Sequence, residues 1–123
     1  MLPVRVLIAD DQAQFRQAAA AFVTAVGGFQ VVGQASTGEE AVRMVGPLQA
    51  ELVLMDVRLP GIDGTEATRR ILAVHPDVRV VLVSTYDPVD LPSDVATCGA
   101  VGFVRKDEIG PETLATLLGN TTF

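Results

Sequence analysis

Residues 52–57 have the sequence LVLMDV, in which four consecutive apolar side chains precede an acidic one. A run this short favours a strand over a helix, and the lack of apolar–polar alternation is typical of a strand covered on both faces. Such strands belong to parallel sheets, because the helices that connect parallel strands lie over each face. The stretch therefore predicts a parallel sheet in which a buried strand ends near Asp56.

Short apolar runs on either side of this stretch alternate with helical patterns. The other expected strands span residues 4–9, 29–34, 78–83 and 102–104. The expected helices span residues 14–26, 38–45, 63–73, 92–98 (a short one) and 111–118. Capping boxes, Thr37-x-x-Glu40 and Asp63-x-x-Glu66, stand at the starts of the second and third helices, and Pro111 stands in the first turn of the last. The pattern predicts a doubly wound α/β fold with a five-stranded parallel sheet.

Composition limits the classes of function. The chain has 123 residues, 49% of them hydrophobic, and a net charge of −6, so we expect one globular domain spanning residues 1–123. The acidic balance argues against nucleic acid or an anionic membrane as a direct partner. The single cysteine, Cys98, excludes a disulfide framework, and the single histidine, His75, excludes a multi-histidine metal site.

The uncharged segment 17–38 is long enough to raise the question of a membrane span. Gln17, Gln30 and Gln34 interrupt it, and Gly27-Gly28 divides it into a helical and an extended half. The N-terminus also lacks the basic and then apolar pattern of a signal peptide. We therefore expect a cytoplasmic protein without a membrane segment.

Polar residues follow the predicted strands at their carboxyl ends. Asp10 and Asp11 follow the first strand, Asp56 ends the third, the hydroxyls of Ser84 and Thr85 end the fourth, and Lys106 follows the fifth. In open α/β sheets, sites form at this edge. Lys106 is the only lysine in the chain. We predict that these side chains form one site.

Carboxylates gathered in one crevice repel one another and call for a cation. An all-oxygen ligand set, without histidine or cysteine, favours Mg²⁺ (or Mn²⁺). A carboxylate nucleophile beside such an ion, with a hydroxyl and a lysine to contact phosphoryl oxygens, is a set suited to phosphoryl transfer. Taken alone, Asp10 and Asp11 also fit a helix N-cap.

Four segments together resemble the receiver domain of two-component response regulators. They are Asp10-Asp11, residues 55–64 (MDVRLPGIDG), residues 81–84 (VLVS) and residues 99–106 (GAVGFVRK). The resemblance covers essentially the whole chain, and residues 10–16 and 102–108 look closest to the branch with LuxR/NarL-like DNA-binding outputs. It implies a flavodoxin/CheY-like (βα)5 fold with the strand order 2-1-3-4-5.

The resemblance also implies roles for individual residues. Asp56 matches the phosphoacceptor, which receives the phosphoryl group from a sensor histidine kinase. Asp11 resembles the direct metal ligand and Asp10 the ligand acting mostly through water, while the backbone carbonyl of Arg58 completes the metal shell. In the same family, Ser84 corresponds to the switch hydroxyl, which moves toward the phosphoryl group.

Two residues, one in the fifth strand and one just after it, complete this set. Phe103 stands at the place of the switch aromatic, and Lys106 matches the family's lysine. The implied result of phosphorylation is a changed surface over the fourth helix, fifth strand and fifth helix, to which a partner, an output domain or a second protomer responds. The implied partners are the cognate sensor histidine kinase and, on phosphorylation, a homodimer, and self-catalysed transfer makes this a switch rather than an enzyme.

The sequence departs from the family pattern in places. Thr85 is larger than the usual residue after the switch hydroxyl, and Asp107 replaces a common proline, so a cis peptide bond is not expected there. The fourth helix looks short because of Pro88 and Pro92. No output domain is expected within this chain, which ends at Phe123.

Other functions stay open at this point. A haloacid-dehalogenase-like phosphatase would need Asp-x-Asp after the first strand, whereas position 12 is Gln. A flavodoxin-like nucleotide binder would need phosphate-binding N–H groups in the first loop, where Asp10 and Asp11 would repel a phosphate. The remaining alternative is a phosphorylation-independent interaction module with a receiver fold.

Overall fold

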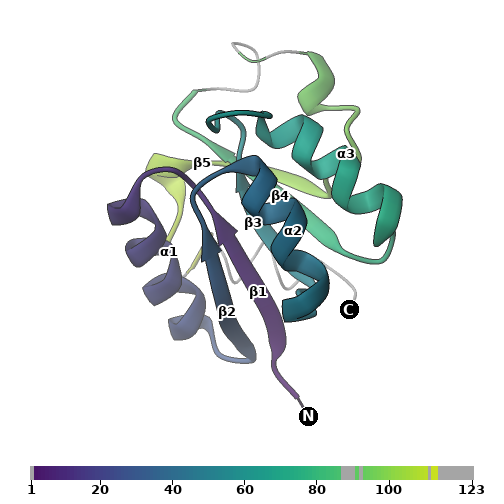
Figure 1. The fold of residues 1–123 in the computed structure, drawn as a ribbon. Helices are drawn as coiled ribbons and strands as arrows, with labels where there is room; N and C mark the ends of the chain where they lie inside the picture. Colours follow the sequence, from purple (N-terminus) through teal and green to yellow (C-terminus); the bar gives the residue numbers. More distant parts are fainter. Residues whose placement is uncertain (1, 87–90, 92, 111, 114–123) are drawn as a thin grey trace.

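The chain folds into a five-stranded sheet with helices on both faces (Figure 1). This computed structural model describes residues 2–86, 91, 93–110 and 112–113. The strands are β1 (Val4–Ala9), β2 (Phe29–Ala35), β3 (Leu52–Asp56), β4 (Arg79–Ser84) and β5 (Gly102–Arg105). All neighbouring strands are parallel, in the order β2-β1-β3-β4-β5. The predicted doubly wound α/β fold and its strand order are thus confirmed.

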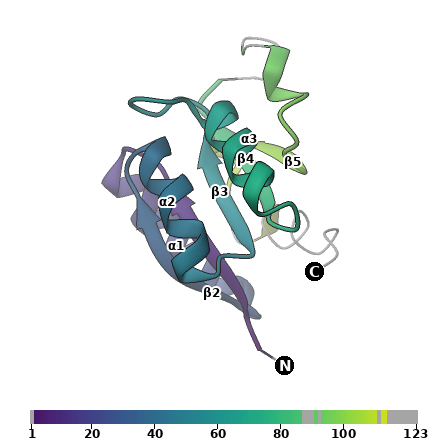
Figure 2. The same ribbon diagram turned by 45° about the vertical axis from the view of Figure 1, so that its right-hand side comes forward.

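The helices lie in two layers. They are α1 (Ala13–Val26), α2 (Gly38–Leu48), α3 (Gly64–Val74) and the short 3₁₀ helices η2 (Ser93–Val95) and η3 (Lys106–Glu108). Figures 1 and 2 show α1 on one face of the sheet and α2 and α3 on the other. The helix predicted over 111–118 lies outside the described residues except for 112 and 113, which are helical.

The core consists of two clusters, one on each face of the sheet. Alternate strand residues belong to opposite clusters, as the two-residue period of a strand requires. In β3, Leu52 and Leu54 pack on the α1 side, whereas Val53 and Met55 pack on the side of α2 and α3. All five residues of β3 are buried. This two-sided burial explains why the strand lacks an alternating pattern.

The predicted capping boxes determine where two helices begin. The Thr37 hydroxyl accepts a hydrogen bond from the Glu40 N–H at 3.0 Å, and the Asp63 carboxylate accepts one from the Glu66 N–H at 2.9 Å. The Glu40 carboxylate returns to the N–H of Ser36 at 2.7 Å, one residue before the cap. These side chains satisfy N–H groups that the first helical turn leaves without partners.

Two helices differ from the sequence-based prediction. The structure extends α2 through Pro47 to Leu48, because a proline near the C-terminal end removes one helical hydrogen bond without stopping the last turn. The short helix predicted over residues 92–98 is confirmed only in part: within the described residues 93–98 it is the single 3₁₀ turn of η2 and not an α-helix. Its Ser, Val and Thr residues are weak helix formers, and so short a segment does not offset the cost of nucleation.

The uncharged segment 17–38 is divided as predicted. α1 ends at Val26, Gly27 follows with φ = 81°, and β2 begins at Phe29. Within the part of the chain that the structure describes, none of the helices has the length and apolarity that crossing a bilayer requires.

Candidate functional site

The carboxyl ends of the strands bring distant polar residues together. Asp10 follows β1, Asp56 is the last residue of β3, Ser84 is the last residue of β4, and Lys106 follows β5. The strands are parallel and in register, so these ends lie at one edge of the sheet. β1 and β3 are neighbours where the winding direction reverses, which is the position that favours a crevice.

Three carboxylates meet at this edge. One carboxylate oxygen from each of Asp10, Asp11 and Asp56 lies within 4.8 Å of the others. Asp10 is fully buried and Asp56 is 5% exposed, whereas Asp11 faces solvent. The cluster therefore has two carboxylates inside the protein and a third at its opening.

Asp10 and Asp11 do not cap α1. The N-cap residue of α1 is Gln12, and its side chain makes no capping hydrogen bond. Asp10 instead accepts a hydrogen bond from the Gln12 N–H at 2.8 Å, which holds the loop after β1. Arg16 also holds this loop, because its guanidinium donates to the Asp10 carbonyl at 2.7 Å.

Lys106 supplies the positive charge of the cluster. Its Nζ lies 2.5 Å from Asp10 Oδ2 and 3.2 Å from Asp56 Oδ2. Only 9% of the side chain is exposed, so water screens these ion pairs weakly. One ammonium group thus bridges the two buried carboxylates, while the charge of Asp11 remains beside them.

The surroundings of Asp56 disfavour its charged form. Burial is the main cause, the charge of Asp10 adds to it, and Lys106 opposes both. Together they raise the pKa of Asp56 from 3.8 to about 6. A further cation would stabilise the ionised carboxylates, and three clustered carboxylates without nitrogen or sulfur ligands fit a hard ion such as Mg²⁺.

The loop after β3 adds backbone contacts to this cluster. The Arg58 N–H donates to Asp56 Oδ1 at 3.3 Å. The Arg58 side chain is exposed, and its guanidinium carbon lies 5.0 Å from the centre of the Tyr86 ring. The contribution of the Arg58 carbonyl to a metal shell stays a prediction.

The two hydroxyls at the end of β4 differ in burial. Ser84 is 1% exposed, and its hydroxyl accepts a hydrogen bond from the Tyr86 N–H at 3.1 Å. Thr85 is exposed. The hydroxyl inside the structure is therefore the one the sequence singled out. Because the Ser84 oxygen is the acceptor in its hydrogen bond with the Tyr86 N–H, the hydroxyl proton of Ser84 remains available to another acceptor.

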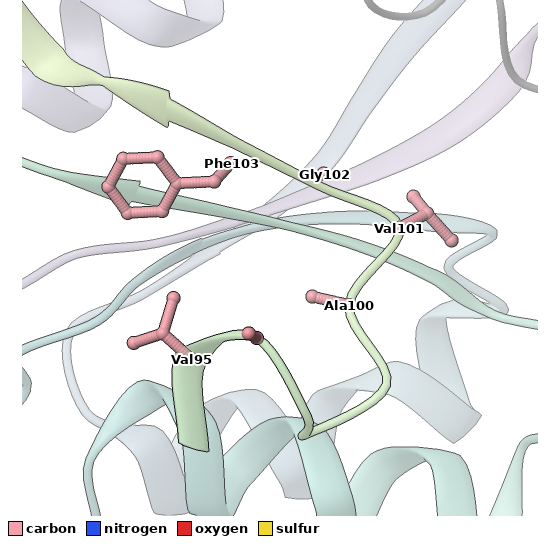
Figure 3. Close-up of a pocket in the computed structure, with 6 residues that line it drawn as sticks. Val95, Ala100, Val101, Gly102 and Phe103 are labelled. Carbon is pink, nitrogen blue, oxygen red and sulfur yellow. The ribbon is translucent and has the colours of Figure 1, made fainter. Parts of the chain in front are cut away.

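Phe103 lies on the neighbouring strand, beside a hollow. It pairs with Leu82 in the register of β4 and β5 and is partly buried against the core on the α3 side. Figure 3 shows its ring across from Val95, with Ala100 and Val101 along the connecting loop. These residues line a hollow of about 240 Å³ between η2 and β5.

The only histidine and the only cysteine of the chain have the surroundings of residues that support the fold. His75 is the C-cap of α3, and Cys98 is buried at 5% exposure. The described residues contain no cis peptide bond.

The sequence patterns did not identify two residues of the first loop and helix that contact Lys106. Lys106 Nζ donates to Gln12 Oε1 at 3.4 Å and lies 4.6 Å from the centre of the Phe15 ring. Gln12 is 94 positions away in sequence. No local pattern links such distant positions, and Phe15 by itself has the pattern of a core residue.

Comparisons with known proteins place this chain in a family. Residues 6–118 match the response regulator receiver domain. The chain is 41% identical over 103 residues to the response regulator GacA of Pseudomonas viridiflava, a match that covers 84% of this chain and 48% of that protein. The chain thus spans about half the length of the curated relatives it matches.

Solved structures agree with this match. The signal receiver domain of NarL from Mycobacterium tuberculosis, a candidate response regulator, superposes with a TM-score of 0.88 at 28% identity. The superposition covers 97% of this chain and 96% of that one. The CheX–CheY–BeF3–Mg²⁺ complex from Borrelia burgdorferi gives a TM-score of 0.84 at 25% identity, covering 95% and 87%. The similarity to the LuxR/NarL-like branch is thereby confirmed. This chain belongs to the response regulator receiver domains of two-component systems.

Proposed function

We propose that residues 1–123 form a single phosphoacceptor domain in which Asp56 receives a phosphoryl group from a sensor histidine kinase. The observation that carries this proposal is the contact of one buried ammonium with two of three clustered carboxylates. Lys106 Nζ lies 3.2 Å from Asp56 Oδ2 and 2.5 Å from Asp10 Oδ2. This arrangement provides a nucleophilic oxygen, a fixed cation beside it and acidic ligands for a second cation.

Asp56 is the nucleophile in the proposed reaction. A carboxylate oxygen of Asp56 forms a bond to phosphorus while the phosphorus–nitrogen bond of the kinase phosphohistidine breaks. The electron pair of that bond stays on the imidazole nitrogen, which then takes a proton, and Asp56 becomes an acyl phosphate. The Lys106 ammonium contacts a phosphoryl oxygen, and the Ser84 hydroxyl donates to another.

The metal ligands in this proposal are Asp10, Asp11, Asp56 and the carbonyl of Arg58. When bound, Mg²⁺ supplies neutralisation of the negative charge on the phosphoryl oxygens. The three carboxylates alone carry more negative charge than Lys106 balances, and this excess supports the assignment. The CheY complex from Borrelia burgdorferi, which contains Mg²⁺ and BeF3, is similar in fold and offers the same support.

Ser84 and Phe103 form the proposed switch. When the Ser84 hydroxyl turns toward the phosphoryl group, the space beside it becomes available to the Phe103 ring. The hollow beside Phe103, which Val95 and Ala100 also line, supports this proposal because it leaves the ring room to move (Figure 3). The surface at η2 and β5 would then change, and a partner, a second protomer or an output domain would respond to it.

The output is proposed from the length of the relatives. GacA of Pseudomonas viridiflava is about twice as long as the part this chain matches. We propose that the receiver controls a segment of such a longer regulator, and through it transcription. A helix-turn-helix encoded downstream of residue 123 would support this output, and a frame that ends there would contradict it.

Phosphoryl uptake tests the proposal directly. Purified chain is incubated with acetyl phosphate or phosphoramidate and Mg²⁺, and intact-protein mass spectrometry measures the added phosphoryl group. We expect labelling that chelation of Mg²⁺ abolishes and that Asp56→Asn removes. Asp77→Asn, which changes an exposed carboxyl outside the cluster, is the matched control and should label normally. Full labelling of Asp56→Asn would refute the assignment.

The alternative of a phosphorylation-independent module makes the opposite prediction. Asp56→Ala would then keep full binding to the partner and full output. A partner response that is lost in Asp56→Ala supports the phosphoacceptor function.

A further inference from the structure

Phe15 lies beneath the ammonium group of Lys106. The Nζ atom is 4.6 Å from the centre of the ring, although Phe15 lies in the first turn of α1 and Lys106 is the first residue of η3, directly after β5. The ring is partly buried and packs against the core cluster on the α1 side of the sheet, which contains Val6, Ile8 and Val83. Its position is therefore fixed by the core, and one face of it is offered to the lysine.

We propose that Phe15 is a positioning residue that holds the Lys106 ammonium over the site through a cation–π contact. The inference rests on the proposed phosphoryl transfer to Asp56. The closest partners of Nζ are Asp56 Oδ2 at 3.2 Å and Asp10 Oδ2 at 2.5 Å. Both carboxylates change during the proposed reaction, because Asp56 becomes an acyl phosphate and both are expected metal ligands.

The ring differs from these partners because nothing in the reaction alters it. An aromatic face attracts a cation without carrying a net charge, and because it has no oxygen atom it is not a ligand for a hard metal ion. The attraction is strongest where water is excluded, and the Lys106 side chain is 9% exposed. A lysine side chain is flexible, and a neutral anchor beside its end limits the positions that the ammonium can take.

A core-packing role alone makes a different prediction. Packing requires an apolar side chain of similar volume, which leucine or methionine supplies at modest cost. The positioning role requires the aromatic face, which tyrosine keeps and leucine and methionine do not. The comparison of Phe15→Leu and Phe15→Met with Phe15→Tyr therefore separates the two roles.

The first measurement detects the contact without any phosphorylation. Because Lys106 is the only lysine, protein grown with isotopically labelled lysine gives a single set of side-chain NMR signals. We expect the ε-methylene protons to be shifted upfield by the ring in the wild type and in Phe15→Tyr. The shift should disappear in Phe15→Leu and Phe15→Met.

The second measurement is the initial rate of labelling by acetyl phosphate with saturating Mg²⁺. Loss of the contact should slow labelling roughly threefold to tenfold in Phe15→Leu, while Phe15→Tyr should stay within about twofold of the wild type. The matched control is Phe22→Leu, which removes a partly buried ring from the same helix and the same cluster. Phe22 is seven residues further along α1, about 10 Å along its axis, and its variant should label normally.

Each outcome decides the proposal. Equal labelling rates in the wild type and Phe15→Leu, or an unchanged lysine shift in Phe15→Leu, would overturn the positioning role while leaving phosphoryl transfer intact. Equal slowing in Phe22→Leu would also overturn it, because that result indicates a general effect of the core. If Phe15→Leu does not fold, Phe15→Met replaces it under the same criteria. A wild-type chain that takes up no phosphoryl group would refute the proposed function and this inference together.

Discussion

The carboxyl group of Asp56 lies where its charge is penalised. It is 5% exposed, and Asp10 lies beside it, so the free energy of the ionised form rises relative to the protonated form. Lys106 offsets part of this penalty. The metal-free protein is thus destabilised by the nucleophilic carboxylate buried inside it. Such perturbed groups are common at functional sites.

Asp56→Asn should stabilise the metal-free protein. In the folded state the pKa of Asp56 is raised to about 6, whereas an aspartate exposed to water has a pKa of 3.8. The folded state therefore binds more protons than the unfolded state between these pH values. Wild-type stability should therefore fall as the pH rises from about 4 to about 6, and the penalty is complete above that range. The asparagine has no charge to bury, and the gain at pH 7.5 should be about 1–3 kcal/mol.

Urea denaturation in EDTA at pH 4.5 and pH 7.5 measures this gain. The difference between variant and wild type should be larger at pH 7.5. Asp77→Asn is the control, because Asp77 is exposed and its change should leave the free energy of unfolding nearly the same at both pH values. A variant that is less stable than the wild type at pH 7.5 would contradict the penalty on Asp56.

Lys106→Met should destabilise the metal-free protein and strengthen the response to Mg²⁺. The substitution keeps most of the apolar stem but leaves Asp10 and Asp56 without their cation, at a cost of about 3 kcal/mol. Lys106 also occupies the oxygens that we expect to bind the metal, so its removal ends that competition. The rise in Tm on adding Mg²⁺ should therefore be larger in the variant than in the wild type.

Thermal denaturation with EDTA and with a series of Mg²⁺ concentrations checks both parts. Arg43→Met is the matched control, because Arg43 is an exposed cation on α2, and its Tm rise should equal that of the wild type. An equal rise in Lys106→Met and the wild type would show that the lysine and the metal do not compete for the same carboxylates.

At the scale of elements, the side chain of Asp94 joins η2 to α3 by hydrogen bonds. Asp94 accepts a hydrogen bond from the Arg69 guanidinium at 2.7 Å, and the Thr65 hydroxyl donates to the same carboxylate oxygen at 3.0 Å. The Arg69 contact, followed by that of Thr65, holds the pKa of Asp94 below its usual value. η2 is a single 3₁₀ turn with two marginal backbone hydrogen bonds, so this attachment carries much of its order.

Asp94→Ala should loosen this segment without unfolding the protein. The amides of Ala96 and Thr97, which donate to Ser93 and Asp94 at 3.3 and 3.2 Å, should exchange roughly tenfold faster. Hydrogen exchange followed by NMR measures this, together with the denaturation midpoint, which should change little. Asp107→Ala breaks a comparable exposed ion pair with Arg105 and should leave these amides unchanged. Unchanged exchange in Asp94→Ala would show that η2 is held by other contacts.

At the scale of the whole molecule, Gly64 joins the site to the helical layer. A Cβ atom at Gly64 would collide with the backbone carbonyl oxygen of Asp56, which no side-chain movement can relieve. The Gly64 N–H donates to the Val57 carbonyl at 2.8 Å, so the start of α3 rests against the end of β3. The phosphoacceptor and the packing of α3 therefore depend on the same close approach.

Gly64→Ala should shift α3 away from the sheet and lower the free energy of unfolding by about 2–3 kcal/mol. Because α3 and Asp56 share the contact, labelling by acetyl phosphate should fall as well. Denaturant unfolding and the labelling assay measure the two effects. Gly110→Ala is the control, since a Cβ there would meet no atom within 4 Å. Normal stability of Gly64→Ala would show that the backbone yields at this point.

The order of elements could be predicted from local patterns. The signals that predicted the elements each act over a few residues, so they could be recognised in the sequence without knowledge of the fold. They are the apolar runs, the capping boxes at Thr37 and Asp63, and the break at Gly27. The conformation of residues 93–98 was less predictable, because the segment has few strong helix formers and because Asp94 contacts Arg69, which is distant in sequence. The residues Asp10, Asp56, Ser84 and Lys106 could be predicted as one site because the ends of parallel strands share an edge.

The sequence by itself determined a parallel α/β sheet with acidic residues, a hydroxyl and one lysine at its carboxyl edge. Only the tertiary structure decided which atoms touch: that Lys106 bridges Asp10 and Asp56, that Gln12 rather than an aspartate is the N-cap of α1, and that the Phe15 ring lies under the ammonium. The physical reason is the sequence separation over which each interaction acts. Hydrophobic periodicity and capping act between neighbours in sequence, whereas ion pairs and ring contacts depend on distances that exist only once the strands are assembled.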